Sequence, residues 1–197
     1  MSQTVPFAIV GCILLVIGLV SVIGVQFTAP ELNPWRDAIS AYVHTPSGIL
    51  YRIQAYATGL GALSLLLALL VQGAKLPGLG LVSLGFLGLT RIGSGFFIAD
   101  AHPPFSRNGQ IHVLLGFGLY TFAALTAGIL TGSLIALPQW HAISGYLAIM
   151  AMVTVGFALA TIVAVILPQA QPYIGLVQRG FYLAMFLWTL GALIPLL

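Results

Sequence analysis

The segment PFAIVGCILLVIGLVSVIGVQF, residues 6–27, decides the fold class, because it carries no charged side chain from end to end. An α-helix needs about 20 apolar residues to cross the hydrocarbon core of a bilayer. Five more apolar segments of comparable length follow it along the 197 residues of the chain. The segments expected to span the membrane are residues 6–27, 48–72, 78–98, 109–135, 141–167 and 175–197.

These segments predict an all-α, polytopic membrane protein, a bundle of six transmembrane helices in a single domain over residues 1–197. Helices are expected because a backbone exposed to lipid must satisfy its own hydrogen bonds. The apolar runs also lack the two-residue alternation of a β-barrel strand. A chain that is 60% hydrophobic and 5% charged leaves no room for a second, soluble domain. We expect a multi-pass protein of a bacterial or archaeal cell membrane.

Charged side chains gather on one side of the predicted membrane, in or beside the odd-numbered connections. The residues on this side are Glu31, Arg36, Asp37, Arg52, Arg91, Asp100, Arg107 and Arg179. Lys75 alone falls on the other side. The chain has no basic run that would bind nucleic acid, which excludes that class of partner. The pattern predicts a polar site at one membrane face, surrounded by membrane lipids.

The first connection reads NPWRDAISAYVH from Asn33 onward. Pro34 is placed to open a short helix and Asn33 to cap it. The apolar residues at four-residue spacing on this helix are Trp35, Ile39 and Val43. We therefore expect a short amphipathic helix that lies at the interface or folds back into the bundle. Arg36 and Asp37 are either solvated there or, with Ser40, part of a site.

The third connection carries acid and histidine side chains. Asn108 is placed to cap the fourth span, which puts His112 in its first turn, where the helix dipole disfavours a protonated ring. A neutral imidazole can ligate a metal or take a proton. Asp100, His102 and His112, with His44 from the first connection, could supply three or four ligands to a zinc ion. The alternative is that these histidines are structural and hydrogen-bonded.

Arg91 is unusual because the sequence places it inside the third span, about 10 Å from its end at the rise of an α-helix. A charge at this depth normally has a partner or faces a water-filled cavity. Asp37, Asp100 and the neighbouring Thr90 are the candidate partners, and snorkelling to the interface is the alternative. Arg179 opens the sixth span and either points at the same cavity or binds a lipid phosphate.

Together these segments resemble the domain-of-unknown-function 998 family of six-helix membrane proteins. The residues that carry the resemblance are Asn33, Asp37, Ser40, Tyr42, residues 97–100, His112, Gln178 and Arg179. The family more often has a proline before the third-loop acid, where this chain has Ile98 and Ala99 before Asp100. The resemblance implies a six-helix fold and no established activity. The family is loosely similar to membrane proteins of lipid remodelling, which favours lipid-like substrates and odd-numbered loops facing outside. The count of Lys and Arg alone favours the cytoplasm.

One hypothesis is an enzyme, a metal-assisted hydrolase or acyl-transfer enzyme that acts on a lipid-like substrate. A zinc ion at the membrane boundary would activate a bound water or polarise a carbonyl. The residues assigned to catalysis are Asp37, Ser40, Asp100 and His112, and those assigned to zinc are His112, Asp100 and His102. The residues assigned to an anionic head group are Arg36, Arg91 and Arg179.

The alternative is a non-catalytic binding or transport protein that uses the same cluster to hold a small anionic amphiphile. A further hypothesis treats the cluster as an ion-paired cap that keeps the helices in register. A haem-binding electron carrier is disfavoured, because axial histidines should face each other at matching depth. His112 and His141 open spans at opposite ends, while His44 and His102 lie in connections.

Overall fold

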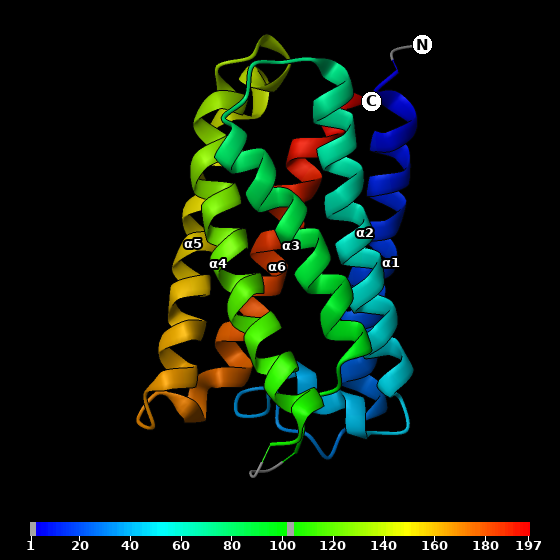
Figure 1. Ribbon diagram of the computed structural model, residues 1–197, viewed down its shortest axis with the longest axis vertical. Helices are drawn as coiled ribbons and strands as arrows, with labels where there is room; N and C mark the ends of the chain where they lie inside the picture. Colours follow the sequence, from blue (N-terminus) through cyan, green and yellow to red (C-terminus); the bar gives the residue numbers. More distant parts are fainter. Residues whose placement is uncertain (1–2, 102–104) are drawn as a thin grey trace.

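The computed structural model describes residues 3–101 and 105–197, and within them it shows six long helices that run up and down a single bundle (Figure 1). The helices are α1 (Val5–Thr28), α2 (Gly48–Gln72), α3 (Gly78–Phe96), α4 (Arg107–Ile135), α5 (Ser144–Ile166) and α6 (Ile174–Leu193). Each lies in a segment long and apolar enough to cross a membrane. The predicted six-helix membrane bundle is therefore confirmed.

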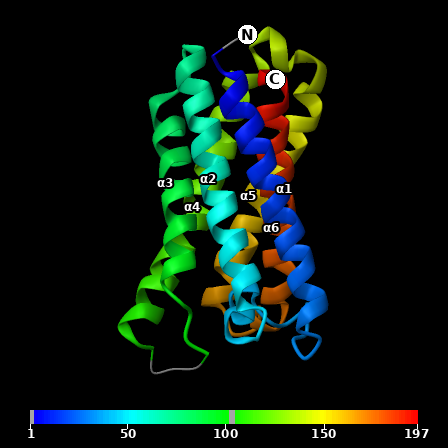
Figure 2. The same cartoon turned by 90° about the vertical axis from the view of Figure 1, so that its right-hand side faces the viewer.

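Four short 3-10 helices join or end these elements. They are η1 (Ile39–His44), η2 (Pro138–Ile143), η3 (Gln171–Tyr173) and η4 (Ile194–Leu196). The start of α1 and the carboxyl terminus lie at the end of the bundle that carries the short connections α2–α3 and α4–α5 (Figures 1 and 2). We call the opposite end, which carries the connections α1–α2, α3–α4 and α5–α6, the polar end.

The core of the bundle surrounds α2 and α6. Their apolar segments are 61% buried inside the protein, against 28% for the segment of α5. Helix α6 packs against α5 and also contacts α1, α2 and α4. Its side chains that are almost completely buried are Phe181, Phe186, Trp188, Ala192 and Leu193. Most residues of these two segments therefore contact other protein groups rather than lipid.

Glycines bring α2 and α3 into close contact. A Cβ atom at Gly59 would lie 2.7 Å from the carbonyl oxygen of Gly88, and one at Gly88 would lie 2.9 Å from that of Gly59. Only hydrogen atoms fit at both positions, which is the usual role of small residues between membrane helices. Because Arg91 follows Gly88 by about one turn of α3, this approach places its side chain directly against α2.

The start of α4 differs from the prediction. Ser106 rather than Asn108 caps the helix, since the Ser106 hydroxyl accepts a hydrogen bond from the backbone N–H of Gly109 at 3.1 Å. Helix α4 therefore begins at Arg107, and His112 lies in its second turn rather than its first. The sequence allowed either residue as the cap, because serine and asparagine are similarly favoured there.

The short helix of the first connection is present, but it begins at Ile39 and not at Pro34. The Asp37 carboxylate accepts a hydrogen bond from the backbone N–H of Asn33 at 2.6 Å, which closes a turn over these residues. Trp35 is 61% exposed whereas Ile39 is 1% exposed, so the expected apolar stripe does not form. The turn competes with a helix start because Asn and Asp side chains readily bond the nearby backbone.

Candidate functional site

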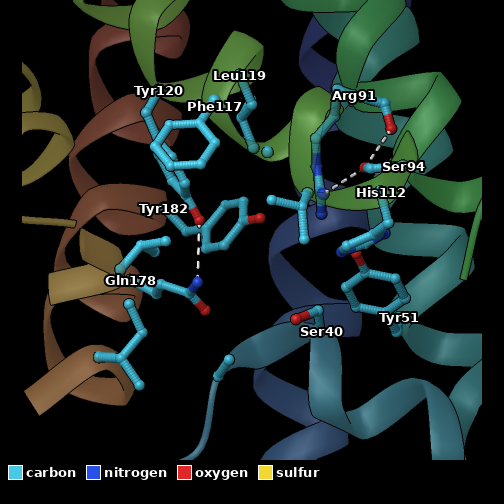
Figure 3. A pocket seen from close by; sticks show the side chains of 15 residues that line it. Ser40, Tyr51, Arg91, Ser94, His112, Phe117, Leu119, Tyr120, Gln178 and Tyr182 are labelled. Atoms are coloured by element: carbon cyan, nitrogen blue, oxygen red, sulfur yellow. Dashed lines mark hydrogen bonds between the residues drawn. The ribbon is translucent and has the colours of Figure 1, made fainter. Parts of the chain in front are cut away.

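A cavity of about 180 Å³ lies inside the polar end of the bundle. Its polar lining residues are Ser40, Tyr51, Arg91, Ser94, His112, Tyr120, Gln178 and Tyr182 (Figure 3). Its apolar side includes Val113, Phe117, Leu119, Val165 and Ile174. These residues belong to η1 and to five of the long helices, so segments that are far apart in the sequence form the site only when the bundle closes.

Arg91 is the most deeply placed charge of the cavity wall and is 1% exposed. Its Nε–H donates to the Thr58 hydroxyl at 3.1 Å, and one terminal nitrogen donates to the Ser94 hydroxyl at 3.0 Å. The other terminal nitrogen donates to the side-chain oxygen of Gln54. A guanidinium has five N–H groups. The side chains of Tyr51 and Tyr182 also hydrogen-bond to the guanidinium, so its remaining N–H groups meet two hydroxyls at the cavity wall.

The guanidinium of Arg91 also lies over two aromatic rings. Its carbon is 4.8 Å from the ring centroid of Tyr182 and 5.7 Å from that of Tyr51. Such cation–π contacts stabilise a guanidinium through the ring quadrupole without neutralising it. Arg91 therefore reaches the cavity as a full positive charge inside a low-dielectric bundle.

The partners suggested for Arg91 by the sequence are not its partners in the structure. Among the described residues no carboxylate pairs with Arg91, and Asp37 and Asp100 do not line the cavity. The Thr90 hydroxyl donates to the carbonyl oxygen of Phe86 at 2.8 Å on its own helix. Snorkelling is wrong as well, since the Arg91 side chain is buried between α2, α3 and α6.

His112 faces the cavity from α4 and is 9% exposed. Its Nδ1 lies 2.7 Å from the carbonyl oxygen of Phe97 at the end of α3. A carbonyl oxygen can only accept, so Nδ1 carries a proton in this contact, and Nε2 of the neutral ring is left as an acceptor. The ring of Tyr51 lies beside it, with centroids 6.5 Å apart.

Gln178 joins the first connection to the bundle at the edge of the cavity. Its side-chain oxygen accepts a hydrogen bond from the backbone N–H of Ile39 at 2.8 Å, and its Nε2 donates to the Tyr120 hydroxyl at 3.0 Å (Figure 3). One carboxamide thus ties η1, α4 and α6 together. Ser40 lines the cavity because this contact holds η1 across its end.

Arg179 lies outside the cavity lining and serves a different set of contacts. Its Nε donates to the side-chain oxygen of Gln26 at 2.8 Å, and one terminal nitrogen donates to the carbonyl oxygens of Asp37 and Gly175 at 3.0 and 2.9 Å. The other terminal nitrogen donates to the Tyr42 hydroxyl at 3.0 Å. Arg179 therefore fastens α1, the first connection and α6 to one another.

The acids predicted for the site cap local turns outside the cavity. The Asp100 carboxylate accepts hydrogen bonds from the backbone N–H of Ser106 at 2.5 Å and from its hydroxyl at 3.0 Å. Asp37 holds the turn at Asn33, and the Arg36 side chain is exposed. Of the residues assigned to catalysis or binding, the structure brings together Ser40, Arg91 and His112 in the cavity.

The zinc hypothesis depends in part on His102, which lies outside the described residues. Within residues 3–101 and 105–197, no three His, Cys, Asp or Glu side chains form a group that could hold a metal ion. The two described members of the predicted set each have another partner, since His112 contacts Phe97 and Asp100 contacts Ser106. The assignment of zinc to these residues stays a prediction.

Sequence reasoning missed the α2 face of the cavity. Tyr51, Gln54 and Thr58 follow each other at spacings of three and four residues, which puts them on one side of the helix. That spacing within an otherwise apolar span was the available signal. The counterpart on α6 is Tyr182, one turn after Gln178.

Comparison with known proteins supports the family and adds no activity. Residues 9–194 match the family described as protein of unknown function (DUF998). The chain therefore belongs to this family. No curated protein and no solved structure matches the chain. The function has to be inferred from the cavity itself.

Proposed function

We propose that this protein binds an anionic amphiphile within the membrane and holds its acidic head group against Arg91. The observation that carries the proposal is the pairing of a fully buried cation with a cavity. Arg91 is 1% exposed, lines the cavity, and has only neutral side-chain partners among the described residues. The natural counter-ion for such a charge is the ligand.

The free energy of a buried charge supports this role. Removing an ion from water costs several kcal/mol even after the protein relaxes, and charged residues inside membranes usually mark a binding or transport path. Three hydrogen bonds and two aromatic faces offset part of this cost for Arg91. An acidic group in the cavity would supply the remaining electrostatic stabilisation by facing the guanidinium and the hydroxyls of Tyr51 and Tyr182 beside it.

The remaining polar lining favours an anion over a neutral ligand. Ser40, Tyr51 and Tyr182 bring hydroxyl groups to the cavity wall, and each hydroxyl can donate a hydrogen bond. No Asp or Glu among the described residues lines the cavity. The cavity wall therefore offers hydrogen-bond donors and no described carboxylate, as expected for a site that binds a carboxylate or phosphate group.

The positions of Asp37 and Asp100 favour ligand binding over the hydrolase hypothesis. Asp37 and Asp100 hold turns in the first and third connections, outside the cavity. Ser40 and His112 are the members of the predicted catalytic set that reach the cavity. A serine and a histidine without an orienting acid beside them give weaker support for catalysis than Arg91 gives for anion binding.

The proposal is tested by binding of a fluorescent long-chain fatty acid to the detergent-purified protein. Arg91→Gln should weaken binding by about tenfold to a hundredfold, since a hydrogen bond to a charged group contributes about 1.5–3 kcal/mol. Arg36→Gln is the matched control, because it removes the same charge from an exposed position at the polar end. Equal binding by Arg91→Gln and wild type would contradict the proposal.

A further inference from the structure

The size of the cavity limits what can lie in it. Its volume of about 180 Å³ is close to that of an apolar cavity of roughly 150 Å³ that holds one benzene molecule. This space holds a carboxylate or a phosphate together with the first carbons of a chain. A long hydrocarbon chain attached to that acid must therefore leave the cavity.

The first connection closes the cavity on the side of the loops. The backbone N–H of Ile39 donates to Gln178, and the backbone N–H of Leu176 donates to the carbonyl oxygen of Trp35 at 3.1 Å. A Cβ atom at Gly175 would lie 2.5 Å from the carbonyl oxygen of Pro34. The connection thus lies directly on the start of α6, with no space between them for a chain.

The cavity reaches the outer surface of the bundle between α4 and α5. Among the described residues that line it, only Val113 on α4 and Val165 on α5 are exposed, each at 39%. Both are apolar and lie on helices whose polar-end halves spread apart (Figure 1). An opening with apolar edges in a membrane-spanning region faces lipid chains rather than water.

Gly116 marks the open space at this exit. It lines the cavity one turn above Val113, and a Cβ atom placed on it would meet no atom within 4 Å. Phe117 and Ile174 complete the apolar wall beside it. The surface between Arg91 and the lipid therefore changes from charged to apolar along the path that a bound chain would take.

We infer that the ligand is a single-chain amphiphile with a compact acid, such as a long-chain carboxylate or an alkyl phosphate, whose chain leaves the cavity past Gly116 between α4 and α5. The inference rests on the proposed function, because it takes the acid to be held at Arg91. The compact acid follows from the volume and the charge, and the route of the chain follows from Val113, Val165 and the space at Gly116. The ligand enters sideways from the membrane.

The test uses a substitution that places a side chain at the exit. A Cβ atom at Gly116 would meet no atom within 4 Å, and the same holds for Gly128, a position of α4 away from the cavity, so Gly116→Leu and Gly128→Leu make a matched pair. Leucine is a better helix former than glycine at both positions, so neither variant should unfold the helix. The probes are palmitate and hexadecyl phosphate, which share a chain and differ in the acid.

We expect Gly116→Leu to weaken binding of the probe by at least about tenfold, since each methylene excluded from an apolar surface is worth about fourfold in affinity. Gly128→Leu should bind as wild type does. Wild-type binding by Gly116→Leu, together with loss in Arg91→Gln, would overturn the route and leave the proposed function standing. Wild-type binding by Arg91→Gln would overturn both.

Competition and labelling test the ligand class and the route separately. Phosphatidylglycerol, which has two chains and a larger head, should compete poorly with whichever probe binds more tightly. Displacement at equal or lower concentration would overturn the single-chain assignment. A palmitate analogue with a photoreactive diazirine in its chain should label α4 and α5 around Val113 and Val165. Labelling confined to α1 and α2 would overturn the exit.

Discussion

The guanidinium groups of Arg91 and Arg179 have similar neighbours, but they join different segments and border different spaces. Each guanidinium donates to a glutamine side-chain oxygen and lies near a tyrosine ring, at 4.8 Å from Tyr182 for Arg91 and 5.6 Å from Tyr42 for Arg179. Arg179 makes four hydrogen bonds, to groups of α1, the first connection and α6. Arg91 makes three to groups of α2 and α3 and borders the polar cavity, whereas Arg179 borders a separate, mainly apolar pocket between α1 and α6.

The difference shows that a hydrogen-bonded arginine at the polar end does not by itself identify a binding site. A guanidinium whose acceptors come from several segments holds those segments together, and losing it should affect folding. A guanidinium that lies against a polar cavity and whose acceptors come mainly from two adjacent helices joins fewer segments, and losing it should affect ligand binding more than folding. Stability and binding measurements on the two arginines can therefore separate these roles.

The largest effect on stability is expected for Arg179→Met. The change removes four hydrogen bonds from a charged donor and leaves the Gln26 side chain and the carbonyl oxygen of Asp37 without this partner. We expect the free energy of unfolding to fall by about 3 kcal/mol, the upper value for a hydrogen bond to a charged group. Thermal unfolding in detergent measures this. Arg36→Met, at an exposed position of the same end, should change it little.

Tyr42→Phe is expected to lower the free energy of unfolding by less than Arg179→Met does. It tests the contacts of Arg179 by changing one of its hydrogen-bond acceptors. The Tyr42 hydroxyl donates to Gln26 and accepts from Arg179, both at 3.0 Å. Losing both contacts while keeping the ring should lower the free energy of unfolding by about 1.5 kcal/mol. Tyr173→Phe is the control, because Tyr173 is 59% exposed. Equal melting temperatures of the two variants would mean that the hydrogen bonds of the Tyr42 hydroxyl contribute little to stability.

Arg91→Met is expected to lower the free energy of unfolding by about 1 kcal/mol, less than Arg179→Met, because only the Gln54 side chain among its three hydrogen-bond acceptors is left without a partner. The hydroxyls of Thr58 and Ser94 retain hydrogen bonds to backbone carbonyl oxygens of their own helices. Thermal unfolding and fatty-acid binding are measured on the same preparation. A loss of stability as large as that of Arg179→Met would show that both arginines are structural and would remove the contrast between them.

The fold could be predicted from the sequence because long apolar runs permit few structures in a membrane. Helix α2 begins and ends at the predicted residues, and the other five differ only near their ends. The errors occur where short polar residues compete for the backbone, as at Ser106 and Asn33. Several side chains could make similar caps there, and tertiary contacts decide between them.

The site could be predicted only in part, since the sequence gives the depth of a residue along a helix and not its neighbours. Arg91 was identified because a charge at that depth is costly in a membrane. Gln54 and Tyr182, which surround it, are on other helices, and their rotation toward Arg91 depends on packing between α2, α3 and α6. The sequence assigns Asp37 and Asp100 to the site because they lie at the same end of the bundle as Arg91. That position does not determine the direction of their side chains.

Asp100→Asn gives the smallest expected effect and separates proximity in the sequence from membership in the site. The Asp100 carboxylate accepts from the backbone N–H and the hydroxyl of Ser106, and an asparagine oxygen can still accept from the N–H. We expect the free energy of unfolding to fall by about 0.5–1 kcal/mol, as for a weakened helix cap. Hydrogen exchange should rise at the first turn of α4, around Gly109, while fatty-acid binding stays at the wild-type level.

Glu31→Gln is the matched control for Asp100→Asn, because it removes an exposed acid from the same end of the bundle. A metal ligand or general base at Asp100 would make the two variants differ strongly in ligand binding or turnover. A cap would make them differ only in exchange at the start of α4. If Asp100→Asn loses ligand binding and Arg91→Gln does not, the acid and not the buried cation defines the site. The contrast between Arg91 and Arg179 would then describe two structural anchors, and the cavity would no longer be the place to look for the ligand.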